Sequence, residues 1–150
     1  AIGARFEAIR EQVLRKDRSA QQQQLKDEVV HMRQRMRDAN LNRSEQFDLK
    51  HDLGGMIDIE FIVQYLVLRH AAQYPQLTAN AGNIALLRRC GELGLIDAGL
   101  AAEVADAYRA MRKLQHSVRL QGQDKTRVDP GLIGHHPDSV QRLWHACFGA

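Results

Sequence analysis

The sequence predicts an all-α fold, a helical bundle of about six helices. Two observations predict it. Pro occurs 3 times in 150 residues and aromatic residues make up only 5%, while Ala, Leu, Gln, Arg and Glu abound, a mixture that favours helices over strands. Apolar residues also recur at helical spacing along most of the chain. Because 44% of the residues are apolar and 26% are charged, residues 1–150 are expected to form a single all-helical domain with its own core.

The first two helices are expected at residues 4–16 and 20–39. The apolar residues of the second recur every three to four positions and are Leu25, Val29, Met32 and Met36. A narrow stripe of this kind is typical of a helix that covers one side of a bundle. The opposite face carries Arg33, Arg35 and Arg37, which we expect to be exposed, either solvated or docked on an acidic partner.

A third helix, expected at residues 56–73, is the most apolar segment of the chain. It follows an extended connector, residues 47–55, and Pro75 is expected to end it. A helix that is apolar all round lies at the centre of its bundle. The residues that cover nearly its whole circumference are Ile57, Ile59, Phe61, Ile62, Val63, Tyr65, Leu66, Val67 and Leu68.

Three further helices are expected at residues 82–93, 98–121 and 138–148. Glycine commonly follows a helix end, Asp is a favoured N-cap, and Pro fits the first helical turn. The residues expected to stop the first helix, cap the second and open the third are Gly94, Asp97 and Pro137. The Pro- and Gly-containing segment between the last two helices, residues 122–136, is expected to be a loop.

Charge and cysteine content narrow the class of protein. The net charge is +3 and the pI about 9.1, only mildly basic, and no nucleic-acid recognition motif is visible, so nucleic-acid binding is not expected. Cys90 and Cys147 are far apart and fall in apolar helical patterns, which indicates reduced thiols. No apolar run reaches the roughly 18 residues of a membrane span. We therefore expect a cytoplasmic protein without a membrane partner.

The stretch KHDLGGMIDIEF, residues 50–61, carries two acidic residues at positions where they could bind a metal ion. On a strand, Asp58 and Glu60 would point the same way; on a helix they lie about 200° apart. The apolar pattern that continues to Leu68 favours the helix. The seven histidines include no H-E-x-x-H motif either. No metal site is predicted in this chain.

Five residues of this stretch remain candidates for a site. Gly54 and Gly55 could cradle an anion with help from Lys50, or could simply make a tight turn. Asp58 is expected in the first helical turn, where it either stabilises the helix start or contributes to cofactor binding. Glu60 interrupts the most apolar helix, and it is either a buried ion-pair partner or a catalytic residue that faces an active site.

At this point the sequence resembles a known family. Residues 50–71 resemble the segment that follows the second nucleotidyltransferase domain in the bacterial glutamine synthetase adenylyltransferase family, whose pattern is close to K-x-D-x-GG-I-x-DIEF-x-x-QYLVL. The residues that fit this pattern are Lys50, Asp52, Gly54, Gly55, Asp58, Ile59, Glu60, Phe61, Gln64, Tyr65, Leu66, Val67 and Leu68. The resemblance is strongest over residues 28–120.

The resemblance implies a role in nitrogen regulation. The chain would be the C-terminal helical regulatory and interaction domain of a larger cytoplasmic enzyme, and the catalytic nucleotidyltransferase domain would lie outside residues 1–150. The parent enzyme would use ATP and Mg²⁺ to transfer AMP to a tyrosine of glutamine synthetase, and would also remove it. The implied partners are glutamine synthetase, a PII-type signalling protein and the adjacent adenylyltransferase domain. A start at Ala1, without methionine, leads us to expect coding sequence upstream.

One departure limits what this chain does alone. Nucleotidyltransferases of this superfamily hold Mg²⁺ with a Gly-Ser turn and a D-x-D pair, and neither occurs here. We expect the isolated chain to lack adenylyltransferase activity and to need no cofactor of its own. Two alternatives stay open. The chain could be a stand-alone adaptor whose basic N-terminal helices bind an acidic protein or nucleic acid, or it could complete the active site through Lys50, Asp58 or Glu60.

Overall fold

The structure, a computed structural model, describes residues 18–149 except 79 and 124, and the helix expected at 4–16 lies outside these residues. The described part is all-α, as predicted, with a single short pair of strands. Its elements in chain order are α2 (Arg18–Ala39), β1 (Phe47–Asp48), α3 (Met56–His70), α4 (Asn83–Glu92), α5 (Ala98–Leu120), β2 (Arg127–Val128), α6 (Pro130–Ile133) and α7 (His136–Phe148).

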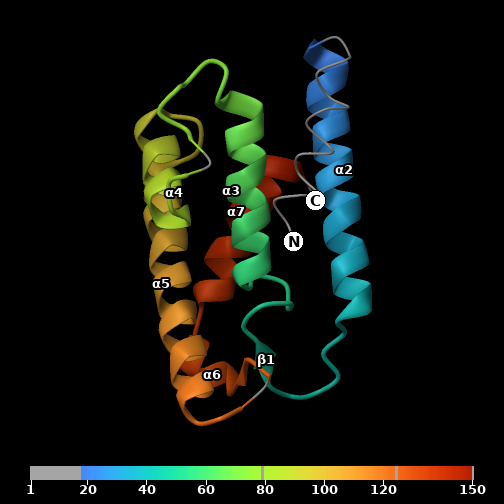
Figure 1. Cartoon of the computed structure of the whole chain (residues 1–150), viewed down its shortest axis with the longest axis vertical. Helices are drawn as coiled ribbons and strands as arrows, with labels where there is room; N and C mark the ends of the chain where they lie inside the picture. Colours follow the sequence, from blue (N-terminus) through green and yellow to red (C-terminus); the bar gives the residue numbers. More distant parts are fainter. Residues whose placement is uncertain (1–17, 79, 124, 150) are drawn as a thin grey trace.

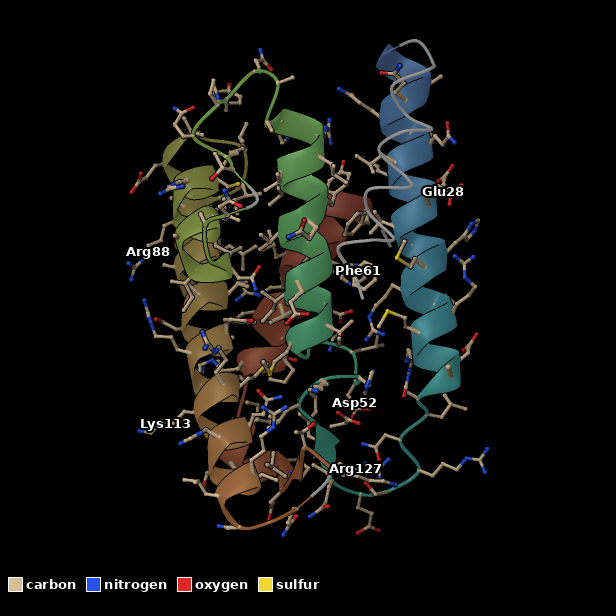
Figure 2. The ribbon with its side chains drawn as sticks, viewed as in Figure 1. Glu28, Asp52, Phe61, Arg88, Lys113 and Arg127 are labelled. Carbon is tan, nitrogen blue, oxygen red and sulfur yellow. The ribbon has the colours of Figure 1, made fainter. Side chains whose placement is uncertain are left out.

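Helix α3 is the centre of the bundle, which confirms the prediction from its apolar pattern. It contacts α2, α4, α5 and α7 (Figure 1), with α2 on one side and α4 and α5 on the other. Figure 2 labels Phe61, whose side chain is fully buried in this core. The helix ends at His70, slightly earlier than expected, and a turn leads on to Pro75.

The predicted helix ends are confirmed by their capping geometry. The Asp97 side chain accepts a hydrogen bond from the Leu100 backbone N–H at 2.9 Å and caps α5. Gly94 follows the end of α4 with a positive φ of 75°, a conformation that glycine adopts without steric cost. Pro137 lies in the first turn of α7.

The segment 122–136 is not the plain loop that was expected. Strand β2 pairs antiparallel with β1, with Phe47 opposite Val128, and α6 follows. Asp129 starts α6 by accepting a hydrogen bond from the Gly131 N–H. Two-residue strands are too short to show an alternating pattern, so the sequence gives no sign of them. Their pairing ties the connector before α3 to the segment before α7.

The two glycines before α3 form a tight turn packed against its neighbours. Gly54 has a φ of 83°, and a Cβ at this position would lie 2.6 Å from the Pro137 carbonyl oxygen of α7. A Cβ on Gly55 would lie 2.8 Å from the Leu49 carbonyl oxygen. Only glycine fits at either position, because neighbouring backbone occupies the space of a side chain. This turn fixes where the connector meets α3.

Candidate functional site

Asp58 is buried on the side of α3 that faces α2. The Arg33 Nε donates a hydrogen bond to the Asp58 carboxylate, and both residues are buried, with 3% and 2% of their surface exposed. The other Asp58 oxygen accepts the Gly54 N–H at 2.7 Å. Arg33 Nη2 also donates to the His51 carbonyl oxygen at 2.7 Å. Asp58 therefore joins the helix start, the glycine turn and α2 in one network.

The expectation that Arg33 is exposed is wrong. Burial of this arginine is tolerated because Nε donates to a carboxylate and Nη2 to a carbonyl oxygen, while Nη1 is buried without a hydrogen-bond partner among the described residues. Arg33 lies four residues after Val29 and one after Met32, on the buried face of α2. This spacing in the sequence indicates that Arg33 lies on the buried face of the helix. Arg35, by contrast, is exposed, so the basic patch of α2 is smaller than the sequence suggested.

Glu60 lies on the opposite face of α3, so it does not share an ion with Asp58. Its Oε1 accepts a hydrogen bond from the Tyr108 hydroxyl of α5 at 3.4 Å, and that hydroxyl accepts one from Asn83 Nδ2 at 3.0 Å. Among the described residues no cation lies within 4.0 Å of the Glu60 carboxylate, so these residues supply no ion pair for it. Burial raises the pKa of Glu60, and the Tyr108 hydrogen bond and the nearby Lys50 charge partly oppose this shift.

A pocket of about 770 Å³ brings two of the candidates together. Lys50 reaches it from the connector and Glu60 from α3, while Asp58, Gly54 and Gly55 are not part of its lining. The remaining walls come from the start of α4 and from one face of α5. The lining residues are Lys50, His51, Met56, Ile57, Glu60, Gly82, Asn83, Ile84, Ala85, Arg88, Tyr108, Arg112, Gln115 and Arg119. We call this the basic pocket.

The basic pocket concentrates positive charge. Its four permanent cations are Lys50, Arg88, Arg112 and Arg119, and its one carboxylate is Glu60. In the described part of the chain, none of these four cations has a carboxylate within 4.0 Å, whereas Arg33, Arg109 and Arg142 do. Figure 2 shows the Arg88 side chain projecting from the outer side of α4. These unpaired cations are available to an anion from outside the bundle.

The start of α4 adds partial positive charge to the same pocket. Its N-cap is Gly82, which has no side chain to accept from the first N–H groups, so the N-cap residue makes no side-chain hydrogen bond. The first N–H groups of an α-helix have no intrahelical partner and carry the positive end of its dipole. Gly82, Asn83, Ile84 and Ala85 all line the pocket. The helix start and the four cations therefore both favour a negatively charged ligand.

A second hollow, of about 410 Å³, adjoins the first and shares Lys50, His51 and Arg119 with it. It adds Lys125 and Arg127 from the segment around β2. Its carboxylate, Asp48, accepts hydrogen bonds from the Lys50 and His51 backbone N–H groups at 2.9 and 3.0 Å. The positive surface thus continues from α4 to β2.

The sequence patterns missed most of this pocket. Tyr108, Arg112, Gln115 and Arg119 recur at helical spacing along α5, so they form one stripe beside the apolar stripe. That stripe was a readable signal. The sequence could not predict that this stripe of α5 lies beside the connector and α4, because that arrangement depends on contacts between segments far apart in the chain.

Two classes of feature are absent from the part of the chain that the structure describes. There, no three His, Cys, Asp or Glu side chains lie close enough to hold a metal ion. No helix of these residues combines the length and the apolar character needed to cross a membrane.

Comparison with known proteins identifies the family of the chain. The family described as GlnD PII-uridylyltransferase matches residues 7–128. The chain belongs to this family. A bifunctional glutamine synthetase adenylyltransferase/adenylyl-removing enzyme from Aromatoleum aromaticum is 52% identical over 149 residues, 99% of the chain. The enzymes of the same name from Ralstonia nicotianae and Nitrosomonas europaea are 56% and 44% identical, over 99% and 98% of the chain.

These relatives confirm the resemblance first seen at residues 50–71 and extend it beyond residue 120. They give no support to a stand-alone adaptor. The chain spans only 16%, 15% and 17% of the length of the three relatives, so it corresponds to one region of a much longer enzyme.

Proposed function

We propose that this chain is a non-catalytic helical module of an enzyme that adenylylates and deadenylylates glutamine synthetase. The observation that carries the proposal is the 52% identity over 99% of the chain to an enzyme named for both activities. In this proposal the parent enzyme transfers AMP from ATP, with Mg²⁺, to a tyrosine of the synthetase. The ATP- and Mg²⁺-binding carboxylates belong to a nucleotidyltransferase domain outside residues 1–150.

The module acts by interaction. It forms the C-terminal part of the enzyme, packs against the adjacent adenylyltransferase domain and positions it, and takes part in the response to a PII-type signalling protein in the cytoplasm. Two features support this role. The chain buries a core of its own, centred on α3. It also presents the basic pocket, a surface with unpaired charge that a partner or ligand can neutralise.

The test is an AMP-transfer assay with purified proteins. The longer protein should incorporate labelled AMP from ATP into glutamine synthetase in the presence of Mg²⁺, and the 150-residue chain should not. A longer protein that leaves glutamine synthetase unlabelled in every condition would refute the proposed activity. Labelling by the isolated chain would refute the assignment of catalysis to another domain.

A further inference from the structure

We propose that the basic pocket is a binding site for the phosphate groups of a ligand about the size of a mononucleotide. The choice of a nucleotide over other phosphate esters rests on the proposed function. The binding of phosphate itself rests only on the geometry of the pocket.

The charge of the pocket favours a phosphate ligand. Four cations from three separate segments line one pocket: Lys50 from the connector, Arg88 from α4, and Arg112 and Arg119 from α5. With the single carboxylate of Glu60 subtracted, the net charge of the lining is 4 − 1 = +3. This equals the net charge of the whole chain, which is also +3. Like charges gathered without counter-charges disfavour the folded chain, and a bound polyanion removes this cost. Arginine and lysine are the side chains that phosphate-binding sites use.

The size and the lining of the pocket suit a nucleotide. The volume of about 770 Å³ lies within the range of small-molecule sites. The lining also has an apolar or flat part, formed by Met56, Ile57, Ile84, Ala85 and the Tyr108 ring, beside the polar side chains of Asn83 and Gln115. A nucleotide has this division, because its phosphates are charged and its base presents a flat face. The pocket therefore suits a ligand with both parts better than an inorganic ion alone.

Hydrogen bonds hold the backbone of Lys50 and His51 in place. Buried Arg33 donates to the His51 carbonyl oxygen at 2.7 Å and also to Asp58. The Asp48 carboxylate accepts the N–H groups of Lys50 and His51. The backbone that carries Lys50 to the pocket is thus anchored to α2 and to β1. A preorganised site loses less conformational entropy on binding than a mobile one.

Glu60 gives the pocket a charge of the opposite sign, which permits a sharp test. Its carboxylate is hydrogen-bonded to Tyr108 within the pocket lining. If the pocket binds phosphate, removing this negative charge should strengthen binding, whereas removing a cation should weaken it. A purely structural role for these residues predicts no such opposite pair of effects.

The experiment is calorimetric titration of the 150-residue chain with ATP, tripolyphosphate and adenosine, in EDTA so that no metal ion contributes. We expect ATP and tripolyphosphate to bind with dissociation constants below about 1 mM, and adenosine to bind far more weakly. Tighter binding of ATP than of tripolyphosphate would assign the apolar wall to the base. Equal binding would assign the pocket to phosphate groups from any source, which still supports the proposal.

Charge variants at two exposed arginines and at the half-buried Glu60 complete the test. The double substitution Arg112→Gln/Arg119→Gln should weaken ATP binding about tenfold or more, and Glu60→Gln should strengthen it about threefold. Arg35→Gln, which removes an exposed cation from α2 outside the pocket, is the matched control and should change binding little. Thermal unfolding of each variant confirms that it folds.

Three results would overturn the proposal: no saturable ATP binding up to about 10 mM, no effect of the double substitution, or an equal loss in the Arg35 control. None of them depends on activity of the longer protein. Failure of this proposal is therefore separable from failure of the proposed function, which the AMP-transfer assay alone decides.

Discussion

Arg33 and Asp58 are the buried charged pair that holds the start of α3 against α2. Their side chains are 4% and 3% exposed, so neither charge is compensated by water. The same network reaches the glycine turn through the Gly54 N–H and the connector through the His51 carbonyl oxygen. Removing one partner leaves the other charge buried and unpaired. This lowers the free energy of unfolding by more than the net contribution of the intact pair.

The substitution Asp58→Asn tests this network. We expect it to lower the free energy of unfolding by about 3–5 kcal/mol, because Arg33 then stays charged without its counter-charge. Urea unfolding followed by circular dichroism measures the change. Arg35→Met on the exposed face of α2 is the control and should stay within about 0.5 kcal/mol of the unmodified chain. A loss of less than about 1 kcal/mol in the Asp58 variant would show that the pair is not buried in solution.

A substitution at Gly54 tests whether the backbone of the turn lies in close contact with α7. Gly54→Ala introduces a Cβ 2.6 Å from the Pro137 carbonyl oxygen at a φ of 83°, so both strain and a backbone clash oppose it. Gly94→Ala is the matched control, because Gly94 has a φ of 75° but nothing within 4 Å of the added Cβ. The control should lose about 1–2 kcal/mol of stability and Gly54→Ala clearly more. Equal losses in urea unfolding would contradict the packing described for the turn.

At the scale of elements, α4 and α7 each bury a cysteine in the core. Cys90 and Cys147 are 1% and 7% exposed. Burial raises the pKa of both thiols from 9.0 to about 11. Between these values the unfolded chain loses thiol protons that the folded chain keeps. The folded state therefore loses stability as the pH rises from about 9 to about 11.

Urea unfolding at pH 8 and pH 10 measures this effect. The chain should be less stable at pH 10, and the double variant Cys90→Ala/Cys147→Ala should lose less stability over the same interval. The variant is the control for tyrosine and lysine groups, which also titrate at alkaline pH. An identical alkaline loss in both proteins would mean that the thiols do not titrate differently in the folded and unfolded chain.

The helices of the chain were readable from the sequence because their signals are local. The stripe that contains Val29 and Met32, the Asp97 cap and the Gly94 stop each lie within one element, and all three appear as expected in the structure. The pairing of β1 with β2 was not readable, because it joins residues about 80 positions apart through strands of two residues. No local pattern marks such a contact.

The candidate site was readable only in part for the same reason. Lys50 and Glu60 were identified from one short stretch, and the structure does bring them together. Arg33 was misassigned to the surface although its spacing from Val29 places it on the buried face of α2, and only its partner, Asp58, 25 residues away, was beyond a local pattern. Arg112 and Arg119 were missed because their role appears only when α5 packs beside α3 and α4.

At the scale of the whole molecule, α3 divides the bundle into two sides with different tasks (Figure 1). On the α2 side, the buried pair of Arg33 and Asp58 holds the start of α3 against α2. On the side of α4 and α5, the cations of the basic pocket have no carboxylate within 4.0 Å among the residues that the structure describes. This division supports the proposed module, in which one face stabilises the fold and the other binds a ligand or partner.

The central proposal is that residues 1–150 form a non-catalytic module of an enzyme that adenylylates and deadenylylates glutamine synthetase. The most direct measurement is labelled-AMP incorporation into glutamine synthetase by three samples assayed side by side: the longer protein, the same protein with residues 1–150 deleted, and the isolated chain. We predict incorporation by the longer protein, a reduced rate after deletion, and none by the isolated chain. Incorporation by the isolated chain, or an unchanged rate after its deletion, would contradict the claim.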